Sequence, residues 1–142
     1  ILGVASRYKF MNKEILRIAL NTENLSSLDN CTHYTKLKSS ICGDEIKIYL
    51  IVKGNKITNF KYQGEICIYC QASASLLSRN IKNTNKKKIK LLLDKSNNSF
   101  KKKKTQSNKD WKSFLKIMNK NNVIRKECLL LPIKATLKAL KN

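Results

Sequence analysis

Residues 45–62 read EIKIYLIVKGNKITNFKY, and they decide the fold. Apolar and polar side chains alternate from Glu45 to Lys53, which is typical of a strand with one buried face. Gly54-Asn55 is a hairpin-turn signal, and Ile57–Tyr62 is expected to return as the paired strand. The stretch therefore predicts an antiparallel hairpin that lays one face on a core.

The segments around this hairpin predict one more strand and several helices. His33–Ser39 is expected to be an edge strand. Apolar residues at helical spacing predict helices at Asn12–Leu20 and Asp110–Asn119. The Ala-, Ser- and Leu-rich segment Ile68–Ile81 is expected to be a closely packed helix, and Lys86–Leu93 another short one. Pro132 suits the first turn of a last helix. Strands followed by helices favour an α+β fold, a small antiparallel sheet of about three strands packed against several α-helices.

The length of 142 residues indicates a single domain. Met11 opens the first helical pattern, so we expect the domain to span residues 11–142, with residues 1–10 an uncertain N-terminal extension and a solvated Lys-rich loop near residues 96–109. No apolar run approaches the ~20 residues that cross a bilayer, and no secretory signal is evident. We therefore expect a cytoplasmic protein without a membrane partner, whose five cysteines are thiols or ligands.

The charge is strongly positive, with 30 Lys and Arg against 9 Asp and Glu and a net charge of +21. A basic nucleic-acid-binding protein with structural cysteines is therefore an alternative function. Nucleic acid is not the expected partner, because the cations are mostly lysine and not the arginine that reads base edges. Aromatic residues such as Phe100 and Trp111 are also not interleaved with a basic stripe. An acidic protein partner would use the same charge equally well.

Three cysteines lie at the ends of expected elements. Cys42-Gly43-Asp44 forms a turn between two strands, and Cys67 opens the Ala- and Ser-rich helix, where the helix dipole favours a thiolate. Cys128 is expected just before the last helix. If these ends converge, three thiolates and the Asp44 carboxylate make a four-ligand set of the kind that zinc accepts. Their spacing is too long for a zinc-finger pattern, so convergence is a hypothesis.

Other interpretations of the cysteines stay open. Cys31 and Cys70 are expected to be small buried apolar residues. Cys67 and Cys70 form a Cys-x-x-Cys pair at a helix start, a redox pattern in thioredoxin-like folds, although no βαβ unit surrounds it here. Cys31 and His33 would share a strand face as nucleophile and base, but no third orienting group is evident.

Three motifs in order resemble one known family. They are SLDNCTH at residues 27–33 with CGD at 42–44, GEICIYCQASAS at 64–75, and RKECLLLP at 125–132. This series, from about Met11 to the C-terminus, resembles the IscU/SufU/NifU-like family of iron–sulfur cluster assembly scaffolds. The long interval between Cys67 and Cys128 is similar to the SufU-like branch. Glu127 stands where IscU has a histidine, and the Leu-Pro-Pro-Val-Lys segment of IscU is absent, which also favours that branch.

The resemblance implies a SufU/IscU-like α+β scaffold with Cys42, Asp44, Cys67 and Cys128 clustered at the surface. It implies that these residues bind a transient [2Fe–2S] cluster or iron, or zinc as in the SufU branch. It also implies a SufS-like cysteine desulfurase and recipient apo-proteins as partners. We expect Cys42 to be the candidate persulfide acceptor, because it lies on a flexible turn. The chain would then be at most a sulfurtransferase acting through a cysteine persulfide.

Overall fold

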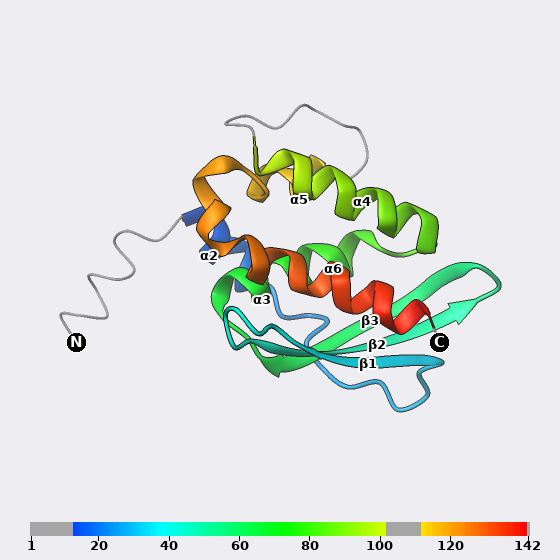
Figure 1. Ribbon diagram of the computed structural model, residues 1–142. Coiled ribbons are helices and arrows are strands. Elements are labelled where there is room, and N and C mark those ends of the chain that lie inside the picture. Colours follow the sequence, from blue (N-terminus) through cyan, green and yellow to red (C-terminus); the bar gives the residue numbers. More distant parts are fainter. Residues whose placement is uncertain (1–12, 102–111, 142) are drawn as a thin grey trace.

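The computed structural model describes residues 13–101 and 112–141, and there helices stack on one side of a three-stranded antiparallel sheet (Figure 1). In chain order the elements are α2 (Lys13–Ala19), β1 (His33–Lys38), β2 (Glu45–Lys53), β3 (Lys56–Glu65), α3 (Ile68–Asn80), α4 (Lys86–Ser99), α5 (Lys112–Ile117), the 3-10 helix η1 (Lys120–Arg125) and α6 (Lys126–Leu140). The predicted α+β class and the predicted number of strands are confirmed.

The hairpin expected from residues 45–62 forms the centre of the sheet. The strand order is β1-β2-β3, and the Gly54-Asn55 turn joins β2 to β3. Ile46, Ile48 and Leu50 are fully buried, whereas the residues between them are only partly buried. One face of the sheet therefore lies on the core, as the alternation predicts.

Helices α3 and α6 pack on that face and against each other, and α4 packs on α6. Helix α3 buries small residues, among them Ala72 and Ser73, which allows its neighbours to approach closely. The buried Ser73 hydroxyl donates a 2.5 Å hydrogen bond to the Leu129 carbonyl oxygen of α6. This bond fixes α6 beside α3, and with it the position of Cys128.

Two expectations near the C-terminus were wrong. Pro132 lies inside α6 and not in its first turn, because the helix already begins at Lys126, directly after η1. Cys128 is therefore the third residue of α6 and does not precede it. Proline has no N–H to donate to the carbonyl four residues earlier, which belongs to Cys128. The helix nevertheless continues, since Leu129, Leu130 and Ile133 are buried around the proline.

Helix α4 is longer than expected and includes the start of the segment assigned to a solvated loop. Ser96 and Ser99 are buried and continue the apolar stripe of Ile89 and Leu92 at helical spacing. Small serines fit against neighbouring helices, so packing extends the helix where the composition suggested a loop. Residues 102–109 of that segment and the extension at 1–10 lie outside the described residues. None of the helices in the described ranges combines the length and apolarity needed to cross a membrane.

Candidate metal centre

The Cys42-Gly43-Asp44 turn joins β1 to β2 and is held by backbone hydrogen bonds. The Ser39 N–H donates to the Asp44 carbonyl oxygen over 2.8 Å, and the Gly43 N–H donates to the Ser39 carbonyl oxygen over 3.0 Å. The Ser39 hydroxyl oxygen also accepts from the Cys42 N–H over 3.3 Å. Gly43 has φ +77°, which favours glycine. The turn leaves Cys42 partly exposed and buries Asp44, which is 8% exposed.

The Asp44 carboxylate is hydrogen-bonded to the start of α3. Its Oδ2 accepts from the backbone N–H of Cys67 over 3.0 Å, and Cys67 is the N-cap residue of α3. The approach is possible because Gly64, at the end of β3, has no side chain. A Cβ on Gly64 would overlap the Glu45 carbonyl oxygen of β2. The close pairing of β2 and β3 at Gly64 therefore brings the second cysteine motif to the first.

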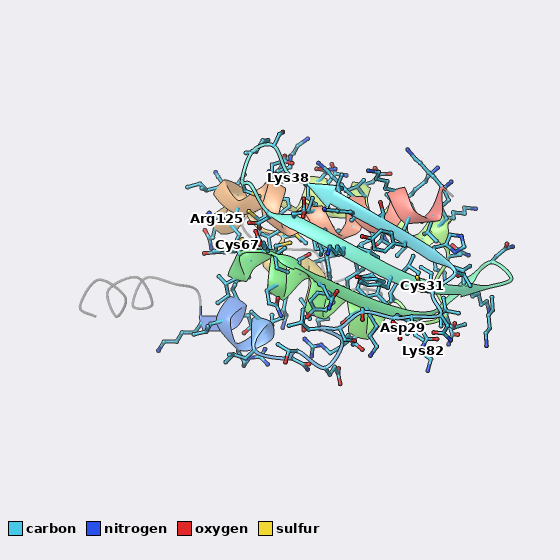
Figure 2. The ribbon with its side chains drawn as sticks, turned by 90° about the horizontal axis from the view of Figure 1, so that it is seen from below. Asp29, Cys31, Lys38, Cys67, Lys82 and Arg125 are labelled. Carbon is cyan, nitrogen blue, oxygen red and sulfur yellow. The ribbon has the colours of Figure 1, made fainter. Side chains whose placement is uncertain are left out.

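Cys128 reaches the same place from the first turn of α6. Its sulfur, the Cys42 sulfur and an Asp44 carboxylate oxygen all lie within 4.8 Å of one another. The Cys67 thiol adjoins this group beside Cys128 and Asp44, although it is not one of the three mutually close residues. The structure thus gathers Cys42, Asp44 and Cys128, with Cys67 beside them (Figure 2 labels Cys67).

Burial opposes ionisation of two thiols of this centre, Cys67 and Cys128. Burial raises the pKa of the Cys128 thiol far above its ordinary value, and the neighbouring Cys42 and Cys67 thiols raise it further. Burial also raises the pKa of Cys67, against the opposing effect of the Cys70 backbone N–H. Without a cation these sulfurs are neutral near pH 7, so a bound cation must displace their protons.

Known proteins match both the sequence and the fold. A model of the NifU-like N terminal domain matches residues 10–109. The chain belongs to this family. It is 30% identical over 135 residues to the iron-sulfur cluster assembly scaffold protein IscU of Thermotoga maritima, covering 94% of this chain and 95% of that protein.

Two solved structures share the fold of this NifU-like chain. The NifU-like N-terminal protein of Brucella abortus has a TM-score of 0.77 at 23% identity, covering 92% of this chain and 91% of that chain. The putative SUF-system scaffold SufU of Fervidobacterium islandicum has a TM-score of 0.76 at 22% identity, covering 94% of this chain and 98% of that chain. The family of iron–sulfur cluster assembly scaffolds is therefore shown by sequence, and its α+β fold by structure.

The donor set of the NifU-like chain fits a thiophilic cation. Tetrahedral zinc with ~2.3 Å bonds to sulfur keeps its ligand sulfurs ~3.8 Å apart. The observed limit of 4.8 Å needs only a small closure to reach that spacing. Thiolates suit zinc and iron, whereas a carboxylate is the harder and weaker partner among them. The Asp44 Oδ2 accepts the hydrogen bond from the Cys67 N–H, and a carboxylate oxygen of Asp44 lies within 4.8 Å of the Cys42 and Cys128 sulfurs.

The remaining cysteines and the histidine lie differently. Cys70 is fully buried in α3, as expected of an apolar cysteine, whereas Cys31 is only partly buried. Cys31 lies at the opposite end of the molecule from Cys67 (Figure 2). The His33 Nδ1 is 2.9 Å from the Thr32 hydroxyl, so the described hydrogen bond of the imidazole goes to a neighbouring threonine and not to a carboxylate. Nothing in this arrangement supports a nucleophile–base pair of Cys31 and His33.

Two features beside the centre were not anticipated from the sequence. The Arg125 guanidinium carbon lies 5.4 Å from the centroid of the Tyr69 ring, a cation–π contact that joins η1 to the first turn of α3. In the sequence Gly64 is only the first residue of the GEICIYCQASAS motif, yet its missing side chain admits the Glu45 backbone. A glycine three residues before a candidate ligand was the one available signal for this close approach.

Proposed function

We propose that this chain is a scaffold that carries a transient [2Fe–2S] cluster, iron or zinc on Cys42, Asp44, Cys67 and Cys128. The observation that supports it is the mutual approach of the Cys42, Asp44 and Cys128 ligand atoms to within 4.8 Å. Cys42 and Asp44 lie on the turn before β2, Cys67 caps α3 and Cys128 lies on α6, so a shared site is the simplest reason for a buried carboxylate among three thiols.

The sulfur for the cluster would come from a cysteine desulfurase. In this step the Cys42 thiolate attacks the outer sulfur of the desulfurase persulfide, a Cys42 persulfide forms, and the desulfurase cysteine leaves as a thiolate. No net oxidation occurs. Cys42 suits the role better than Cys128, because Cys42 is partly exposed on a turn whereas Cys128 is 2% exposed inside a helix. Recipient apo-proteins would then take the cluster.

Asp44 would make the carrier labile. Its carboxylate is the hardest ligand of the set, and its hydrogen bond to the Cys67 N–H competes with coordination. A site of four thiolates would hold a cluster more firmly and release it less readily. The weak fourth ligand therefore suits a scaffold, which must give its cargo away.

The test is metal loading of single variants. Cys42→Ser, Cys67→Ser and Cys128→Ser should each weaken zinc binding by more than the 10–100-fold that loss of an outer partner typically costs, as measured by competition with a chromophoric chelator. Cys31→Ser is the matched control and should leave the affinity unchanged, because Cys31 lies at the other end of the molecule. Equal affinity in the control and in all three variants would refute the site.

Mass spectrometry tests the acceptor. After incubation with desulfurase and free cysteine, the Cys42 peptide should gain the mass of one sulfur atom. A persulfide found on Cys67 or Cys128, with Cys42 unmodified, would refute the choice of Cys42 without affecting the metal site.

A further inference from the structure

The sheet has a second face that no helix of the described residues covers. Helices α3, α4, α5 and α6 lie on one side of the sheet (Figure 1), and the view from below shows the strands in front of them (Figure 2). Alternation along the strands and the strand register place three rows of side chains on the open face. The rows are Tyr34–Tyr49–Lys61, Lys36–Lys47–Gln63 and Lys38–Glu45–Glu65.

The first row contains a fixed pair of aromatic rings. Tyr34 and Tyr49 are directly paired across β1 and β2, with ring centroids 5.2 Å apart and an interplanar angle of 54°. The Tyr49 hydroxyl donates a 2.9 Å hydrogen bond to the Gln63 side-chain oxygen of β3, which holds its ring in place. Tyr34 is 43% exposed, a high fraction for a large ring on a strand. The pair offers aromatic surface to solvent at little further cost in side-chain entropy.

Lysines lie on two sides of this aromatic pair. Lys36 and Lys47 form the next row, and Lys61 continues the tyrosine row with its Nζ donating to the Asn24 side-chain oxygen over 2.9 Å. Lys36 also pairs with Glu45 at 3.4 Å, but both side chains are substantially exposed, so this ion pair neutralises little. The acidic strand residues of this face, Glu45 and Glu65, lie opposite each other in the β2–β3 register, two rows away from the tyrosine row.

We propose that this open face binds single-stranded nucleic acid, with bases stacked on Tyr34 and Tyr49 and phosphates held by Lys36, Lys47 and Lys61. Aromatic rings that stack bases, set among cations that follow the backbone, are the recurrent means of binding single strands without sequence preference. The net charge of +21 complements a polyanion. The tyrosines lie on different strands, so their proximity was hidden in the linear sequence. The site is separate from Cys42, Cys67 and Cys128 and does not rest on the proposed scaffold function.

Fluorescence anisotropy with labelled oligothymidylate tests this assignment on the full chain. Tyr34→Leu should weaken binding on the order of ten-fold, whereas Tyr34→Phe should retain it, because the phenyl ring still stacks. Lys47→Glu should weaken binding much more than the control Lys90→Glu, which makes the same change in net charge at an exposed position of α4. Oligouridylate should bind within a few-fold of oligothymidylate, since the site uses base faces and phosphates and not the 2′-hydroxyl.

Several outcomes would overturn the assignment. Unchanged affinity in Tyr34→Leu, or equal effects of Lys47→Glu and Lys90→Glu, would show that the binding depends only on the overall charge of the protein. Equal affinity for an acidic polypeptide that is insensitive to Tyr34→Leu would point to a protein partner instead. No measurable binding at low salt would also end the proposal. Thermal unfolding of each variant verifies that the exposed substitutions leave the fold intact.

Discussion

Gly64→Ala should destabilise the protein and disturb the metal centre together. Gly64 has φ +148°, and an added Cβ would overlap the Glu45 carbonyl oxygen and lie 3.0 Å from the Ile46 Cα. Both contacts are with the backbone of β2, where Ile46 pairs with Gly64 and Glu45 with Glu65. A backbone neighbour cannot rotate away as a side chain can, so relief requires β2 and β3 to separate at this end.

The size of the effect follows from these contacts. An alanine in this backbone region costs about 1–3 kcal/mol in strain. Separation of the strand ends adds the loss of a few ladder hydrogen bonds at ~1 kcal/mol each. The expected total is about 3–5 kcal/mol, which corresponds to a fall in Tm of roughly 10–20 °C for a domain of this size. The metal centre should also weaken, because Cys67 follows Gly64 by three residues and would move away from Asp44.

Urea and thermal unfolding followed by circular dichroism measure this loss. Gly54→Ala is the matched control, since Gly54 also has a positive φ, +62°, but a Cβ there meets no atom within 4 Å. It should cost only ~1–2 kcal/mol, the penalty of a left-handed residue, and should leave zinc affinity unchanged. The reasoning fails if both variants lose equal stability, or if Gly64→Ala binds zinc as tightly as the parent chain.

Three further predictions follow from the site and its supports. Burial raises the pKa of the Cys70 and Cys128 thiols, so the metal-free protein should keep its full stability below about pH 8.5 and lose stability as the pH rises. For the fully buried Cys70 the loss should reach up to ~1.4 kcal/mol per pH unit. Urea unfolding at pH 7 and pH 10 measures this loss, and equal stability at both pH values would contradict the prediction. The Asp44→Ala variant should retain a bound cluster longer and transfer it more slowly, as followed by absorption. Asp44→Asn keeps an acceptor for the Cys67 N–H, so its stability to unfolding should be closer to that of the parent chain than the stability of Asp44→Ala is. Ser73→Ala should cost ~1 kcal/mol for the hydrogen bond to Leu129, and the bulkier Ser73→Leu should cost several times more because α3 and α6 meet there; similar losses for both would argue against close packing at Ser73.

The hairpin could be predicted from the sequence because its signals are local. The alternation of Ile46, Ile48 and Leu50 and the Gly54-Asn55 turn each act within a few residues, and the strands have the predicted positions. The errors arose where packing between distant segments overrides such signals. Ser96 and Ser99 are poor markers of an apolar helix face, yet they are buried because α4 packs against its neighbours.

The first turn of α6 shows the same limit. A proline is favoured at the start of a helix, so Pro132 predicted a start at the wrong place. The helix begins six residues earlier, where Leu129 and Leu130 already face the core. A rule based on neighbouring residues does not predict the burial of these leucines, because that burial depends on packing against distant segments. The correction bears on the proposed function, because Cys128 lies within a helix whereas Cys42, the proposed sulfur acceptor, lies on a turn.

The approach of the candidate ligands could not be derived from their spacing. Cys42, Cys67 and Cys128 are joined by long segments, and only the resemblance to a family implied that they meet. The structure supplies the physical reason in two contacts. Gly64 lets β3 lie against β2 so that Asp44 reaches the Cys67 N–H, and the Ser73 hydrogen bond holds α6 against α3.

The two proposed sites use opposite faces of one strand and should respond independently. Ile46 and Ile48 of β2 face the core, whereas Lys47 and Tyr49 face the open side. Asp44 immediately precedes β2, and its carboxylate accepts from the Cys67 N–H and lies beside the Cys42 and Cys128 sulfurs. Tyr34→Leu should therefore leave zinc affinity unchanged, and Cys42→Ser should leave oligothymidylate binding unchanged. If either variant impaired both activities at full stability, the two faces would be coupled through β2, and the separation argued from strand alternation would be wrong.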